Sequence, residues 1–212
     1  MLTVGEAIQQ RRSIRKFKSD PIRKDVVRQL LEAARLAPSG SNRQPWRFLV
    51  VTDADERRAL RDICMGQAFV DEAPLVFVCC LDLQAYDQSA RRARAQEFEA
   101  FGVLETLSGE VRDPEYRSRM LAQPDPDRDT ALRSGMPNLY IAIEHMVLTA
   151  TALGLGSCWV GAIRDVKEIG SFFGLPENIV PVVVLPVGYP AIVPPQRPRL
   201  PLNEILLRPV DW

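Results

Sequence analysis

The run Leu75-Val-Phe-Val-Cys-Cys-Leu81 is apolar at every position. A strand formed by this run presents hydrophobic side chains to both faces of a sheet, so it needs cover on each side and belongs at the sheet's centre. Cys79 and Cys80, as neighbours on a strand, then point to opposite faces. Further strands are expected at 46–51 and at 179–187, where Pro181 and Pro186 are restricted to an end or an edge because proline has no amide hydrogen.

Helix signals alternate with these strand signals. Thr3-Val-Gly-Glu6 has the pattern of a capping box. An apolar stripe over 26–34 predicts a second helix that stops before Pro38, and Asp53 and Asp165 are placed to cap two further helices. Residues 84–107 are also expected to be helical, with Phe98, Phe101, Leu104 and Leu107 on one side.

The segment 139–153 is apolar almost all round, which predicts a helix buried on nearly every side. Pro137 suits its first turn, where a missing amide hydrogen costs nothing. Gly154-Leu-Gly156 ends the helix, and Cys158-Trp-Val160 is expected to resume as strand. A helix apolar on all sides needs more cover than its own sheet supplies.

Two stretches are predicted to leave the compact body. The polar stretch 108–133 is too long for a plain connector, and the region from about 84 to 135 is expected to be either a lid or a disordered surface insertion. The region from about 190 to 212 is rich in proline, so it is expected to be an extended arm with Leu202, Ile205 and Leu206 as its anchor. No linker divides the chain, so residues 1–212 are predicted to form one domain.

Composition narrows the class of protein. The 212 residues are 46% hydrophobic and 25% charged, with 27 basic and 27 acidic side chains, so neither nucleic acid nor a membrane surface is an expected partner. No signal peptide precedes the first helix, and the longest apolar stretch, 139–155, contains Glu144 and His145. Four cysteines without metal-ligand spacing are predicted to be reduced core thiols in a cytoplasmic protein, and no metal site is expected. They are Cys64, Cys79, Cys80 and Cys158.

The sequence matches the common catalytic motifs only in part. Ser13-Ile-Arg-Lys16 matches the SxxK pattern of serine acyl-transfer enzymes, but its companion motifs are absent. Gly154 and Gly156 lack the third glycine of a dinucleotide fingerprint and follow a helix rather than a strand. His145 is expected to be a satisfied core or interface residue. What remains is a set of hydrogen-bond donors suited to phosphate, unless these side chains are simply solvated. The donors are Arg11, Arg12, Ser13, Arg15, Arg197 and Arg199.

Four segments, in order, resemble the landmarks of the FMN-dependent nitroreductase family. They are Arg11-Arg-Ser-Ile-Arg15, Ala37-Pro-Ser-Gly-Ser-Asn-Arg-Gln-Pro-Trp46, Ala152-Leu-Gly-Leu-Gly-Ser157 and Arg197-Pro-Arg199-Leu-Pro201. The resemblance implies an α+β fold with a mixed, mostly antiparallel central sheet flanked by helices, in a domain-swapped homodimer. The C-terminal arm of one subunit is expected to embrace the other.

The resemblance also implies residue roles. Arg11, Arg12 and Ser13 are expected at the FMN phosphate, with Arg197 and Arg199 closing the site, and Arg15 beside the flavin ring as the charge that tunes it. The loop from the partner subunit supplies Pro38, Ser39, Gly40, Ser41, Asn42 and Gln44. Further ring contacts are expected from Gln67, Gly156, Ser157, Trp159, Val160 and Gly161. Some family members have a glutamate where this chain has Val160.

The implied activity is ping-pong hydride transfer from NADH or NADPH, through FMN, to a small flat acceptor such as a nitroaromatic or a quinone. No protein nucleophile is required, so no catalytic side chain is predicted. Aromatic residues of the 84–135 region are candidates for stacking on the acceptor, although Phe98 and Phe101 better suit packing their helix onto the core. Reductive dehalogenation, oxygen-dependent flavin breakdown and a non-catalytic flavin sensor remain alternatives.

Overall fold

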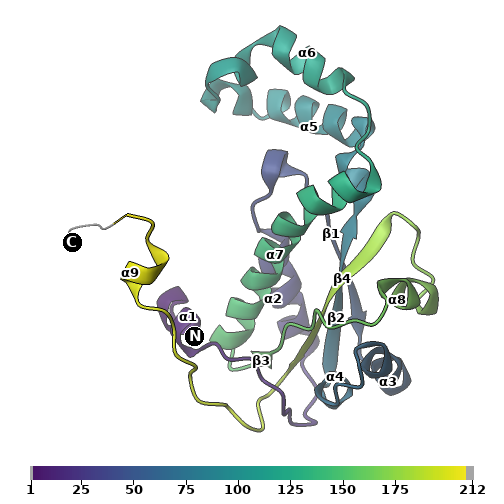
Figure 1. Cartoon of the computed structure of the whole chain (residues 1–212), viewed down its shortest axis with the longest axis vertical. Helices are drawn as coiled ribbons and strands as arrows, with labels where there is room; N and C mark the ends of the chain where they lie inside the picture. The colour runs from purple at the N-terminus through teal and green to yellow at the C-terminus, as the bar shows by residue number, and fades with distance from the viewer. Residues whose placement is uncertain (1, 209–212) are drawn as a thin grey trace.

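The computed structural model describes residues 2–208, which form a four-stranded sheet enclosed by helices (Figure 1). The strand order is β1-β2-β4-β3, with β1 at Trp46–Val51, β2 at Leu75–Asp82, β4 at Ile179–Gly188 and β3 at Gly156–Ser157. All three strand pairings are antiparallel, and a parallel bridge joins Ser13 to Ser157. The sheet is therefore mixed and mostly antiparallel, as predicted.

Strand β2 is the central strand that its sequence predicts. It pairs with β1 on one side and β4 on the other, and all its residues are buried. Its alternate side chains enter two separate hydrophobic clusters, Phe77 and Cys79 in one and Val78 and Cys80 in the other. The two neighbouring cysteines thus face opposite layers, and all four cysteines are buried and free.

Helices cover both faces of the sheet. One cluster joins it to α2 (Lys24–Arg35) and α7 (Arg128–Ala152), and the other joins it to α3 (Ala54–Ile63), α4 (Phe69–Glu72) and α8 (Val166–Phe172). The short α1 (Val4–Gln10) packs against α7. The predicted caps are confirmed, because the side chains of Thr3, Asp53 and Asp165 each accept an amide hydrogen bond from the first turn of a helix.

Two expectations about proline and strand limits are wrong, whereas a third is confirmed. Pro137 lies inside α7 rather than at its start, because the helix begins at Arg128, capped by Asp127. Pro181 and Pro186 are each the third residue from an end of β4, as expected, and Pro181 lies where the pairing register with β2 shifts, beside Cys80. The strand after α7 is Gly156–Ser157 rather than 158–160, and Val160 forms only an isolated bridge to Val184.

The stretch between β2 and α7 is a helical excursion. It holds the 3-10 helix Leu83–Tyr86, α5 (Gln88–Ala100), two short 3-10 helices (Val103–Thr106 and Gly109–Arg112) and α6 (Pro114–Ala122). α5 and α6 lie beyond one end of the sheet (Figure 1). The expected continuous helix over 84–107 is wrong, because the backbone reverses at Gly102 with φ at 66°. Phe101 is 80% exposed instead of packing on the core. The alternative of a disordered insertion is likewise replaced by ordered helices.

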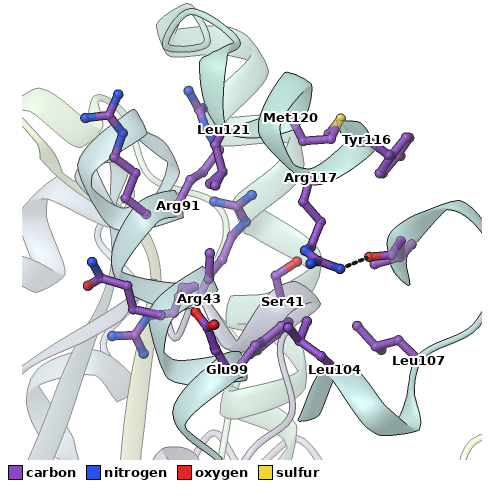
Figure 2. Close-up of a pocket in the computed structure, with 16 residues that line it drawn as sticks. Ser41, Arg43, Arg91, Glu99, Leu104, Leu107, Tyr116, Arg117, Met120 and Leu121 are labelled. Atoms are coloured by element: carbon purple, nitrogen blue, oxygen red, sulfur yellow. Dashed lines mark hydrogen bonds between the residues drawn. The ribbon is translucent and has the colours of Figure 1, made fainter. Parts of the chain in front are cut away.

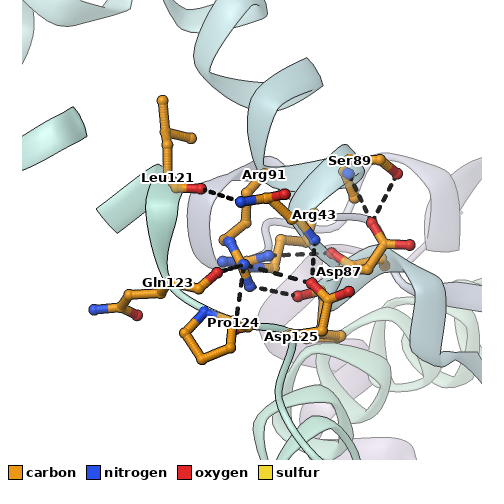
Figure 3. Close-up of polar contacts among 12 residues, drawn as sticks. Arg43, Asp87, Ser89, Arg91, Leu121, Gln123, Pro124 and Asp125 are labelled. Atoms are coloured by element: carbon orange, nitrogen blue, oxygen red, sulfur yellow. Dashed lines mark hydrogen bonds and ion pairs between the residues drawn. The ribbon is translucent and has the colours of Figure 1, made fainter. Parts of the chain in front are cut away.

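Arg91 of α5 ties the two ends of this excursion together (Figure 3). Its guanidinium donates to the carbonyl of Tyr86 at 2.9 Å and, across the base, to the carbonyls of Gln123 and Pro124. The backbone amide of Gln88 donates to the Asp125 carboxylate, which also faces Arg91. One hydrogen-bond network therefore joins the two points at which the excursion leaves and re-enters the rest of the fold.

The C-terminal arm and one side of α7 expose apolar side chains in the single chain. From Pro190 onward the chain is extended, and the short α9 (Leu202–Ile205) leaves Leu202 and Ile205 exposed, so these residues anchor nothing within their own subunit. On α7, Tyr140 and Ile141 are also exposed, so burial on nearly every side is not reached within one chain. Within residues 2–208, no helix is long and apolar enough to cross a membrane.

Gly188 marks a close contact that tests this packing. A Cβ there would lie 2.7 Å from Cδ of Pro74 and 2.9 Å from Cδ1 of Phe17. Gly188→Ala is therefore expected to lower the free energy of unfolding by about 1–3 kcal/mol in urea titrations. Gly170→Ala is the matched control, because that glycine lies within α8 with open space around it, and this change is expected to stabilise by roughly 0.5–1 kcal/mol. Equal stabilities of the two variants would contradict this packing.

Candidate functional site

The N-terminal arginine segment is joined to the strand that follows α7. The amide of Ile14 donates to the carbonyl of Ser157 at 2.9 Å, and Ser13 bridges Ser157 in parallel. Ile14 is buried against Gly156, where a Cβ would come within 2.3 Å of Ile14 Cγ1. Only glycine permits this approach. Two motifs that are far apart in the sequence therefore meet at the edge of the sheet.

Two cations at this junction form no ion pair among residues 2–208, although Arg11 lies near the Glu144 carboxyl. Over residues 2–208, the guanidinium groups of Arg11 and Arg15 form no hydrogen bond and no ion pair, and Arg15 lies over the ring of Phe69 at 5.9 Å. Burial raises the pKa of the nearby Cys158 thiol, while the charges of Arg15 and Arg11 act to lower it. Burial likewise raises the pKa of the Glu144 carboxyl, with Arg11 opposing the shift. The junction is thus a positive site beside a buried strand.

The segment 156–161 contributes less free backbone than the sequence suggests. The amides of Cys158 and Val160 already donate to the carbonyls of Pro186 and Val184. Gly161 is exposed, with open space where a Cβ would point. Trp159 packs edge-on against Tyr140 of α7, with ring centroids 5.7 Å apart. A planar ligand at this segment would therefore meet aromatic side chains and the Gly161 backbone rather than the Val160 amide.

Gln67 lies on the approach to the same junction. Its side-chain amide donates to the carbonyl of Cys64 at 2.9 Å, at the turn where Met65 and Gly66 have positive φ. Phe69, two residues later, is the ring beneath Arg15. Gln67 is thus close in sequence to the ring that Arg15 covers, and its expected contact with the flavin ring stays a prediction.

The loop 38–44 is separated in space from the arginine junction at 11–15. Ser41, Asn42 and Gln44 all have positive φ, and the Ser39 hydroxyl accepts from the Gln44 amide at 2.9 Å. The Gly40 amide donates to Asn138 of α7 at 3.0 Å. From Asn138 to the helix end before β3 is about 20 Å at 1.5 Å per residue, and within residues 2–208 no hydrogen bond joins this loop to 11–15. One chain does not bring the two halves of the predicted site together.

The remaining predicted donors lie on the C-terminal arm or contact it. Arg12 donates to the carbonyls of Gln9 and Arg11, and to the side chain of Gln196 at 3.2 Å. Arg197 and Arg199 are exposed, and Arg199 donates to the Arg197 carbonyl. Arg12 therefore holds the arm against the end of α1, a structural contact that the sequence did not indicate.

Two side chains escaped the sequence reasoning. The family resemblance implies no role for Arg43, although this residue is partly buried, donates to the carbonyl of Ala85 at 3.1 Å and covers the Tyr86 ring at 4.9 Å. Tyr140, on the helix assigned to packing, instead flanks Trp159. The position of Arg43 inside a loop of otherwise small polar residues was the available signal. His145, as expected, is satisfied, because its Nδ1 lies 3.3 Å from the Ala33 carbonyl.

The family of the chain follows from comparison with known proteins. The Nitroreductase family pattern matches residues 8–189, and the chain belongs to that family. It is 35% identical over 209 residues to a Thermus thermophilus protein named NADH dehydrogenase, covering 98% of this chain and 96% of that one. It is 25% identical to a Bacillus subtilis FMN reductase, covering 97% of this chain and 73% of the relative. The expected oxidoreductase family is confirmed.

Solved structures agree on the fold. The NADPH:FMN oxidoreductase of Vibrio harveyi, solved with NAD+, superposes with a TM-score of 0.75 at 24% identity, over 99% of this chain and 78% of that one. A nitroreductase-like protein of Streptococcus mutans gives 0.77 at 22% identity, over 97% of each chain. The predicted α+β architecture is thereby confirmed. Within residues 2–208, no cluster of side chains has the composition of a metal site.

The buried thiols give a pH-dependent prediction. Burial raises the pKa of Cys64 and of Cys80 to about 12, and it raises the pKa of Cys79 and Cys158 as well. The reactive thiolate is then scarce at pH 8. A thiol-specific disulfide reagent is expected to modify no cysteine of the native protein within minutes at pH 8, and all four after denaturation. As the pH rises, Cys158 should react first, because Arg15 and Arg11 oppose its shift. Rapid native modification at pH 8 in a Cys158→Ser variant would contradict the burial of the other three.

Proposed function

We propose that this chain is an FMN-dependent NAD(P)H oxidoreductase that reduces small flat acceptors such as nitroaromatics and quinones. The observation that carries the proposal is the junction of Arg11, Ser13 and Arg15 with the Gly156-Ser157 strand, where two guanidinium groups that form no ion pair flank a backbone contact that requires glycine. Relatives of the family are named for FMN reduction with NAD(P)H. Bound FMN supplies a carrier that accepts a hydride from the nicotinamide and passes electrons to the acceptor.

The donor set fits a phosphorylated flavin. Arg11 and Ser13 hold the phosphate, because a guanidinium without a protein partner and a hydroxyl beside it provide charge-assisted hydrogen bonds. Arg12 steadies this segment through its bonds to Gln9 and Arg11. Arg197 and Arg199, on the exposed arm, close the phosphate site.

The second half of the site contacts the ring. Arg15 lies beside the ring edge, where its positive charge stabilises the negative charge of the reduced state. Gln67, Ser157, Trp159 and Gly161 would border the ring, with the Val160 amide already bonded to Val184, and Trp159 and Tyr140 would exclude water from one side. Donor and acceptor occupy the same open face in turn, which requires no catalytic side chain.

The split position of the predicted residues supports a homodimer. Within one chain the loop 38–44 lies toward the far end of α7 from the arginine junction, whereas in a two-fold dimer a loop of one protomer meets the junction of the other. The exposed apolar residues suit such an interface. They include Val4, Ile8, Leu36, Tyr140, Ile141, Leu202 and Ile205. The four buried free thiols favour a reducing compartment such as the cytoplasm.

The proposal is tested by the visible spectrum of the purified protein and its response to the nucleotide donor. Flavin bands are expected that bleach when NADH or NADPH is added without oxygen and return when a quinone or nitroaromatic follows. Bands that persist under both donors would contradict the oxidoreductase role while leaving flavin binding intact. A colourless protein that takes up no added FMN would overturn the whole proposal.

Arg11 and Arg15 are expected to differ in what they control. Arg11→Ala removes a phosphate contact worth about 1.5–3 kcal/mol, so FMN affinity should fall by roughly 10- to 150-fold. Arg15→Ala should lower the reduction potential of the bound flavin, because the charge that stabilises the reduced state is lost, and Arg15→Lys should restore most of the potential.

Flavin fluorescence titration and potential measurement read these two effects separately. Arg28→Ala, on the exposed side of α2, removes an equal charge and should change neither value. If Arg11→Ala and Arg28→Ala retain FMN equally well, the phosphate lies elsewhere.

A further inference from the structure

The helical excursion encloses a pocket of about 590 Å³ beside the loop 38–44 (Figure 2). The volume falls in the range typical of small-molecule sites, about 300–1,000 Å³. Ser41 and Arg43 line it from the loop, and α5 and α6 supply the opposite walls. Much of the lining is apolar or aromatic. These side chains are Phe98, Leu104, Leu107, Val111, Tyr116, Met120 and Leu121.

The pocket is also rich in arginine, and most of these arginines are already engaged. Arg94 pairs with Glu97, and Arg91 faces Asp125 at 3.5 Å. Arg117 of α6 donates to two backbone carbonyls, those of Val111 and Arg112. These contacts hold the walls together and leave few donors for a ligand.

Arg43 and Arg92 are the exceptions, and of these two Arg92 is exposed to solvent whereas Arg43 is partly buried. Among residues 2–208 the Arg43 guanidinium has no carboxylate partner, and its only hydrogen bond goes to the Ala85 carbonyl at 3.1 Å. Burial lowers the pKa of Arg43; Tyr86 opposes this shift, and the like charge of Arg91 adds to it. A half-buried cation next to a second cation is costly without an anion. The pocket therefore combines an apolar body with one partly buried, unneutralised guanidinium, while the other unpaired charges of its lining, Arg92 and Glu99, are exposed.

We propose that this pocket binds a flat apolar carboxylic acid, with the carboxylate on Arg43 and the apolar body against Phe98, Tyr116 and Leu121. The proposal rests on the proposed function and names its acceptor class: aromatic acids, rather than neutral aromatics. The link to the reaction is Ser41, because the loop assigned to the flavin of the partner protomer also lines the pocket. Arg43 is then a specificity-determining residue and not part of the electron-transfer machinery.

Binding is tested with 2-naphthoate and 2-naphthamide, which differ in charge but not in shape, by calorimetric titration of the holoenzyme. The acid is expected to bind about tenfold more tightly or better, as a charge-assisted hydrogen bond in a partly buried site provides. The preference should weaken as salt is added. Equal affinity for acid and amide in the unaltered protein overturns the proposal, even if no variant can be purified.

Variants locate the anion site. Arg43→Met keeps the apolar stem, and it should weaken the acid about tenfold while leaving the amide within about twofold. Arg43→Lys should retain part of the preference because it keeps the charge. Arg133→Met is the matched control, since Arg133 is exposed on α7 and bonds only to Thr130. An acid preference that survives in Arg43→Met overturns the assignment. The assignment also fails if Arg43→Met weakens the binding of NADPH but leaves the affinity for the acid unchanged.

Turnover separates this proposal from the one it rests on. With 4-nitrobenzoate and 4-nitrobenzamide as acceptors, Arg43→Met should raise KM for the acid about tenfold and leave kcat and the amide's KM nearly unchanged. If naphthoate binds as expected but neither nitro compound is reduced, the proposed oxidoreductase function fails while the pocket assignment stands. If both nitro compounds are reduced with equal KM in the unaltered protein, the function stands and Arg43 does not select the acceptor.

Discussion

Ile14 packs against Gly156 so closely that no other residue fits at position 156, and its amide donates to the next residue, Ser157. This contact places the arginine segment 11–15 on the edge of a sheet whose central strand is buried on both faces. The position of Arg11 and Arg15 therefore depends on backbone geometry rather than on any side-chain partner. A site built this way is rigid before a ligand arrives, so little binding energy is lost to ordering it.

Besides this backbone contact, the site depends on three cations whose charge is not neutralised by an ion pair among residues 2–208. Arg11 and Arg15 lie at the sheet edge, and Arg43 lies half-buried beneath the excursion, and none of the three forms an ion pair among residues 2–208. Other cations do pair with carboxylates, as Lys16 does with Glu72 and Arg47 with Asp82. Because the overall charge is balanced, the positive charge at these two places is a local feature, and it matches the anionic groups of a phosphorylated cofactor and an acidic acceptor.

The excursion is made of ordered helices, but its helices α5 and α6 are not packed into the core around the sheet. Arg91 closes its base through carbonyls on both sides, yet α5 and α6 bury no residue completely. Segments held mainly by polar contacts open more easily than a core does. An arrangement of this kind suits a wall that must admit substrates of varied size, and it places substrate preference in a part of the chain that can change without disturbing the fold.

The sequence by itself determined the local elements and the chemistry available. The apolar run 75–81 was read correctly as a central strand, and the caps at Thr3, Asp53 and Asp165 were each confirmed, because these signals act within a few residues. The family motifs likewise identified the candidate donors. Tertiary structure alone decided where Pro137 is tolerated, how residues 84–127 fold, and that Arg43 and Tyr140 face the proposed functional surfaces. These outcomes depend on contacts between residues distant in the chain, whose energies override local preference and leave no periodic trace in the sequence.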